Sequence, residues 1–146
     1  TKDMLSLQVS AGLCVLGFAL VIVAHVLIIL ASRTVGIMSG TKKPGDFFPS
    51  RKVVDQNTFI LRVSASHANC LENFPLFAAV VLTNEAYGSA DVDFLASCYF
   101  GFRLLQVFFH LCGVTDTLIT VRFYSFAPQL VLLITMALRT AATLSV

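Results

Sequence analysis

Four long hydrophobic stretches constrain what this chain can fold into. A transmembrane helix needs about 20 mostly apolar residues, and stretches of that length occupy residues 5–32, 62–83, 93–112 and 119–144. Only 12% of the 146 residues are charged, whereas about 25% is usual in soluble domains. We therefore predict an all-α integral membrane protein, a four-helix bundle that forms one domain over residues 1–146.

The first stretch is too long for the core of a cleaved secretory signal. Its apolar run from Leu5 to Ala31 is about twice the usual length of such a core. We expect it to remain as the first membrane span.

Basic residues predict the orientation of the spans. Six of the ten Lys and Arg residues lie between positions 33 and 62, in and at the end of the segment that joins the first two stretches, whereas loop 84–92 contains none. The positive-inside rule then places the first loop, and with it loop 113–118, in the cytosol of a bacterium or on the cytosolic face of the endoplasmic reticulum. The basic loop favours lipid headgroups or a small anionic substrate, and nothing supports a nucleic-acid partner. Its Gly and Pro residues predict a connection, with a helix beginning near Lys52.

The four cysteines predict no metal centre. All of them fall inside hydrophobic stretches, and none has the paired C-x-x-C spacing of a zinc or redox site. We expect them to pack as small apolar residues. His25 is expected to be an interhelical hydrogen-bond donor.

Polar side chains inside the second and third stretches mark where function is expected, because such groups are costly in lipid unless they pair or face a polar cavity. On the second stretch they follow helical spacing, as they do on the third. The two sets are Arg62, Asn69 and Glu72, and Arg103, Gln106 and His110.

An antiparallel hairpin closed by loop 84–92 would bring these residues together in pairs. The expected pairs at equal depth are Glu72 with Arg103, Asn69 with Gln106, and Ala65 with His110. This matched spacing predicts a polar site between the helices. The alternative is an ion pair and an amide pair that only set the helix register.

One segment resembles a known family. Residues 69–77, Asn-Cys-Leu-Glu-Asn-Phe-Pro-Leu-Phe, resemble the N-C-x-E-x-F-P-L-F segment of the MAPEG family, the membrane-associated proteins in eicosanoid and glutathione metabolism. The likeness is to the branch with leukotriene C synthase and the microsomal glutathione transferases. It extends over nearly the whole chain, including the span spacing, the basic first loop and an arginine at the start of the last span.

The resemblance implies a homotrimer that binds glutathione between subunits near the cytosolic side. Asn69 and Glu72 match the family residues that contact the polar groups of the peptide, and Arg103 matches an arginine of the third span. Gln106 stands where relatives have His or Tyr, and His110 stands where they have Tyr.

Arg122 matches the arginine that stabilises the glutathione thiolate, with Tyr124 and Ser125 as polar support. A thiol with a pKa of about 8.5 is mostly protonated at neutral pH, and a permanent cation beside it favours the nucleophilic thiolate. The alternative is an ordinary basic residue at the start of a helix. Arg33 is expected either to meet a glutathione carboxylate or to bind a lipid headgroup.

The chain departs from the family pattern at Ala65, where relatives have an arginine that Arg62, one turn earlier, would have to replace. The function expected is that of a glutathione transferase or peroxidase, in which the thiolate attacks a hydrophobic electrophile or a lipid hydroperoxide delivered from the membrane. A non-catalytic lipid-binding or scaffold protein of the same fold is the main alternative. A structural subunit or a small transporter is a third reading.

Overall fold

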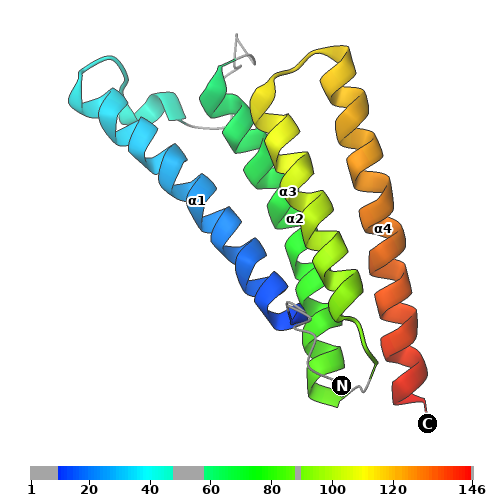
Figure 1. The fold of residues 1–146 in the computed structure, drawn as a ribbon. Coiled ribbons are helices and arrows are strands. Elements are labelled where there is room, and N and C mark those ends of the chain that lie inside the picture. The colour runs from blue at the N-terminus through cyan, green and yellow to red at the C-terminus, as the bar shows by residue number, and fades with distance from the viewer. Residues whose placement is uncertain (1–9, 48–57, 88–89, 146) are drawn as a thin grey trace, which may run out of the picture.

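The fold is a bundle of four long helices, seen in a computed structural model that describes residues 10–47, 58–87 and 90–145. The elements are α1 (Ala11–Met38), the 3₁₀ turn η1 (Pro44–Phe47), α2 (Phe59–Tyr87), α3 (Asp93–Cys112) and α4 (Asp116–Leu144). In Figure 1, α2 and α3 lie in the centre, and α1 and α4 lie at the flanks. The described residues contain no strand, so the predicted all-α fold is confirmed.

Three of the described helices, α1, α3 and α4, are long and apolar enough to cross a membrane. Helix α2 is as long as α4 but is not among them, because the polar residues of the second stretch lower its mean hydropathy. Helix α3 has the bounds predicted for the third span. Helix α1 extends six residues beyond the predicted end of the first span, so Arg33 lies within this helix. The helix start predicted near Lys52 lies outside the described residues.

Side-chain caps and a glycine define the helix ends. The hydroxyl of Ser10 accepts a hydrogen bond from Leu13 N at the start of α1, and Thr115 accepts one from Leu118 N at the start of α4. After α1 the chain turns at Gly40, whose φ of 69° lies in the left-handed region that glycine adopts readily. The starts of α2 and α4 lie at the same end of the bundle as the ends of α1 and α3 (Figure 1).

An aromatic cluster forms the centre of the core. The rings of Phe77 on α2 and Tyr99 on α3 stack with their centroids 4.3 Å apart, and Phe18 of α1 packs against both. The guanidinium of Arg103 lies 5.2 Å from the centre of the Phe18 ring, which is within reach of a cation–π contact. The buried guanidinium of Arg103 therefore packs directly against this aromatic cluster.

Buried hydrogen bonds tie neighbouring helices together. His25 Nδ1 donates to the Val21 carbonyl at 2.7 Å, which leaves Nε2 of the neutral ring to accept from the Ser66 hydroxyl at 3.0 Å. Thr140 of α4 donates to Asn84 of α2. His25 thus takes part in an interhelical bond, although as its acceptor and not as the predicted donor. Such bonds let polar groups lie within a lipid-embedded bundle.

The register between α2 and α3 differs from the predicted one by about one turn. Arg103 lies opposite Asn69, to which its Nη1 donates a hydrogen bond, and not opposite Glu72. The reason lies in the connection between the helices, where Asn84 Nδ2 donates to the Ala90 carbonyl at 2.9 Å. Ala90 therefore lies beside the last turn of α2 before α3 begins. Ala65 and His110, another predicted pair, nevertheless line the same cavity.

Candidate functional site

A cavity opens at the end of the bundle where α3 ends and where α2 and α4 begin. Its volume is about 640 Å³, within the usual range of small-molecule sites. Its lining residues come from these helices and from the short α3–α4 connection: Leu61, Arg62, Ala65, His110, Val114, Ile119 and Arg122. Two arginines and a histidine predicted for the site are therefore brought together, whereas none of these lining residues is acidic.

The two arginines of this cavity are positioned by the end of α3. Arg62 Nε donates to the Leu111 carbonyl at 3.0 Å, and Arg122 Nη2 donates to the Gly113 carbonyl. The last carbonyls of a helix have no partner within it and carry the negative end of its dipole. The C-terminus of α3 therefore attracts both guanidinium groups and orients them.

His110 connects α3 to Arg122 within the same cavity. Arg122 Nη1 lies 3.3 Å from His110 Nδ1. Arginine can only donate, so Nδ1 accepts, and the neutral ring carries its proton on Nε2. Nε of Arg122 is buried and has no hydrogen-bond partner among the described residues. The site thus retains donor capacity that the described fold does not use.

Ala65 lies in the wall of this cavity together with Arg62, one turn earlier on α2. The short side chain at position 65 leaves room beside the guanidinium. A positive charge from α2 is therefore present in the cavity even though position 65 supplies none.

A second polar cluster lies deeper in the bundle. Arg103 is fully buried, and its Nε and Nη2 atoms have no partner among the described residues. Its single hydrogen bond goes to Asn69, which is half-buried. The hydroxyl of Tyr99 nearby is also buried, with no hydrogen-bond partner in the part of the chain that the structure describes. This cluster is distinct from the cavity, because neither Arg103 nor Asn69 lines it.

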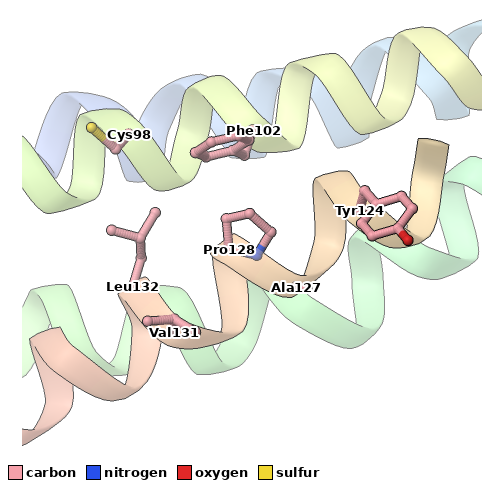
Figure 2. Close-up of a pocket in the computed structure, with 7 residues that line it drawn as sticks. All are labelled: Cys98, Phe102, Tyr124, Ala127, Pro128, Val131 and Leu132. Carbon is pink, nitrogen blue, oxygen red and sulfur yellow. The ribbon is translucent and has the colours of Figure 1, made fainter.

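The other predicted site residues lie elsewhere. Gln106 accepts a hydrogen bond from Gln129 Nε2 at 3.0 Å, and buried Ser125 donates to the Val121 carbonyl of its own helix. Exposed at the surface of the subunit are Glu72 on α2, Arg33 on α1 and Tyr124 on α4. Tyr124 lines a different groove, between α3 and α4 (Figure 2).

Gln129 is a buried polar residue that was not among the predicted ones. It bridges Gln106 and the Ser125 carbonyl. The signal for it was present in the sequence, since a glutamine four residues after Ser125 is a polar residue inside an apolar stretch. It was not predicted, because its partner Gln106 lies on another helix and the pattern within one stretch does not show that pairing.

The fold and the cavity define a helical membrane protein with a cationic pocket at one end of its bundle. The chain belongs to the MAPEG family, whose model matches residues 11–142. This membership confirms the resemblance seen in the sequence and supports, in general terms, a role in glutathione or eicosanoid metabolism. No curated protein and no solved structure matches the chain.

Proposed function

We propose that this protein is a glutathione-dependent transferase or peroxidase of the membrane. The proposal depends chiefly on the cavity that combines Arg62, His110 and Arg122 without an acidic residue among its described lining. Glutathione is an anionic peptide with a thiol, and both of its carboxylates and its thiolate are favoured by fixed cations. The cavity supplies two such cations.

Each residue of the cavity has a distinct role in this proposal. Arg122 lies beside the sulfur and stabilises the thiolate, since a guanidinium keeps its proton under all physiological conditions. Arg62 pairs with a glutathione carboxylate and so replaces the arginine that relatives have at the position of Ala65. His110, neutral and protonated on Nε2, donates a hydrogen bond to the peptide.

The chemistry follows from the thiolate. In the transferase reaction the sulfur forms a bond to an electrophilic carbon, and the electrons move to the leaving group or into the acceptor. In the peroxidase reaction the sulfur attacks one oxygen of the peroxide and breaks the O–O bond. The products are glutathione sulfenic acid and, after protonation, a lipid alcohol. A second glutathione then converts the sulfenic acid to a disulfide and water. Holding the two reactants together supplies much of the rate enhancement.

We place the working site in a homotrimer. Glu72 is exposed on α2 with no partner among the described residues, and a carboxylate at this depth is unfavourable against lipid. Coverage of this face by a neighbouring subunit removes that cost. It also brings Asn69 and Glu72 to a subunit interface, where they can contribute to peptide binding.

A second function, that of a non-catalytic lipid-binding scaffold, is favoured by one observation. Arg62 and Arg122 both bind carbonyls at the end of α3, so helix capping alone accounts for their positions. Under this alternative the cavity binds no glutathione. A fatty ligand would still raise the melting temperature of the protein.

The ultraviolet absorbance of bound glutathione thiolate separates these functions. We expect the band on adding glutathione to the purified protein, and we expect Arg122→Ala to lower the thiolate fraction about ten-fold at neutral pH, equivalent to one unit of thiol pKa. Arg122→Lys should retain part of the band. Arg139→Ala is the matched control, because Arg139 lies at the other end of the same helix and donates to the Asp91 carbonyl.

The outcome without a band also has a clear meaning. If the unaltered protein shows no band while a fatty ligand raises its melting temperature, the scaffold function is supported. An unchanged band in Arg122→Ala, with the helical content preserved, would remove Arg122 from its proposed role.

A further inference from the structure

Two buried polar side chains of α3 have no role in the proposed glutathione chemistry. Arg103 is 0% exposed, and Tyr99, about one turn earlier on the same helix, is 1% exposed. Neither residue lines the arginine cavity. The guanidinium carbon of Arg103 lies 6.0 Å from the centre of the Tyr99 ring, and Phe18 of α1 packs against both side chains. Arg103 and Tyr99 therefore form one polar cluster inside the bundle.

The unpartnered atoms of this cluster can all donate hydrogen bonds. Within the described residues, Nε and Nη2 of Arg103 have no partner, and neither has the Tyr99 hydroxyl. Only Nη1 of Arg103 is bonded, to the side-chain oxygen of Asn69. A guanidinium has no acceptor atom, and leaving a buried donor unsatisfied is costly. A ligand that satisfies this cluster is therefore a hydrogen-bond acceptor.

The charge and the burial of the cluster favour a monatomic anion. No carboxylate among the described residues pairs with Arg103, and a nearby negative charge lowers the cost of burying a guanidinium. A water molecule leaves that charge unbalanced and brings two hydrogens that need acceptors of their own. A peptide or lipid carboxylate carries a chain with it, whereas a single halide requires the least rearrangement of side chains that are closed to solvent.

We infer that Arg103 and Tyr99 form a binding site for one halide ion, which is chloride under cellular conditions. Nε and Nη2 of Arg103 and the hydroxyl of Tyr99 donate to the ion. The ion balances the charge of Arg103 and so stabilises the packing of α3 against α1 and α2. This binding requires no glutathione and no residue of the arginine cavity. It therefore stands whether the protein is an enzyme or a scaffold.

Thermal unfolding in matched salts tests this site. The purified protein is melted at constant ionic strength while potassium gluconate is replaced stepwise by potassium chloride or potassium bromide. We expect either halide to raise the melting temperature until the effect saturates, because an ion that binds only the folded state stabilises it. Gluconate is too large for the buried cluster and serves as the reference anion. A melting temperature that is the same in all three salts would refute the inference.

Two substitutions assign the halide effect to the cluster. Arg103→Met keeps most of the side-chain volume and should abolish the effect. Tyr99→Phe removes one donor and should weaken halide binding about five-fold, as for the loss of one hydrogen bond; it carries the test alone if Arg103→Met does not fold. Arg139→Met, at an exposed position of α4, is the matched control and should keep the full effect. An equal effect in all variants would indicate adventitious surface binding only and would overturn the site.

The arginine cavity also carries positive charge, so it is tested separately. Arg122→Ala should retain the halide effect, because the cluster shares no residue with that cavity. Loss of the effect in this variant would place the ion in the cavity and refute the inference. A crystal soaked in bromide gives the position directly, and we expect an anomalous diffraction peak beside Nε of Arg103 and the Tyr99 hydroxyl. Bromide peaks confined to the cavity or to the protein surface would also refute the inference.

Discussion

Arg103 is a charged residue in the interior of the bundle. Its side chain is fully buried, yet within the described residues it makes a single hydrogen bond, to the neutral Asn69. No carboxylate of the described residues pairs with it. A buried charge without an ionic partner contributes little or nothing to stability, because its desolvation offsets what it gains.

We therefore expect two substitutions of Arg103 to behave differently. Arg103→Ala opens a large void and should lower the free energy of unfolding by about 2–5 kcal/mol. Arg103→Met keeps most of the volume and should stay within about 1.5 kcal/mol of the unaltered protein. Thermal or detergent-induced unfolding measures both, and Asn69 loses its partner equally in each.

The opposite pattern would be informative. A methionine variant as unstable as the alanine variant would show that the charge itself stabilises the bundle. Loss of glutathione-induced stabilisation in both variants, with folding retained in Arg103→Met, would instead indicate that Arg103 takes part in peptide binding.

Helix α3 makes polar contacts with the helices on either side of it. Its C-terminal carbonyls position Arg62 of α2 and Arg122 of α4. Deeper along the same helix, Arg103 binds Asn69 of α2, and Gln106 binds Gln129 of α4. The remaining helices are thus aligned by polar contacts with one central helix, as well as by apolar packing.

The pairing of α3 with α4 can be measured with a double-mutant cycle on Gln106 and Gln129. Interhelical hydrogen bonds in membrane proteins average about 0.6 kcal/mol and reach about 1.7. We expect Gln106→Leu and Gln129→Leu to couple by an energy in this range. The two single substitutions together should cost more stability than the double substitution, since each single variant removes the partner of a buried amide that remains.

A pair with no direct contact serves as the control for this cycle. Ser66→Ala combined with Gln129→Leu should be additive, because Ser66 binds His25 of α1. Zero coupling between Gln106 and Gln129 would mean that their hydrogen bond does not contribute to α3–α4 pairing.

The outer surface of the bundle is mostly apolar but includes an exposed carboxylate on α2. Most of the exposed surface of α1 and α4 is apolar, as expected against lipid. Helix α2 differs, because Glu72 is exposed in the middle of a helix that is long enough to span a membrane. Self-association through α2 is the simplest way to remove this carboxylate from lipid.

Cross-linking tests this association in the full chain. With Cys98 and Cys112 replaced by Ser, Glu72→Cys should give covalent dimers with a short bis-maleimide in the membrane. Leu138→Cys, on an exposed apolar face of α4, is the matched control and should give little product. Equal yields at the two positions would contradict an interface on α2.

Much of the fold was predictable because its signals are local. Apolar runs predicted the helices, and α3 was placed at its true bounds from composition alone. Helical periodicity correctly placed Arg103 and Gln106 on an inward face. Helix α1 continues to Met38, six residues past the predicted end of the first span, because a helix can extend beyond its apolar stretch.

The site was predictable only in part, because it depends on contacts between distant segments. Helical spacing singled out Arg62 and His110, and the family resemblance singled out Arg122; the fold brings all three to one cavity. The expected opposition of Glu72 and Arg103 was wrong by one turn, and it depended on how Asn84 folds back the α2–α3 connection. No local pattern in the sequence encodes that bond.

The sequence by itself determined the all-α membrane class and the residues with polar chemistry, because hydrophobicity and helical period act over a few neighbouring positions. Only the tertiary structure decided which polar groups meet. The end of α3 attracts two arginines into one cavity, while Tyr124 and Pro128 turn to an apolar groove on another face. The physical reason is that helix register is set by loop geometry and interhelical hydrogen bonds, which join residues far apart in the chain.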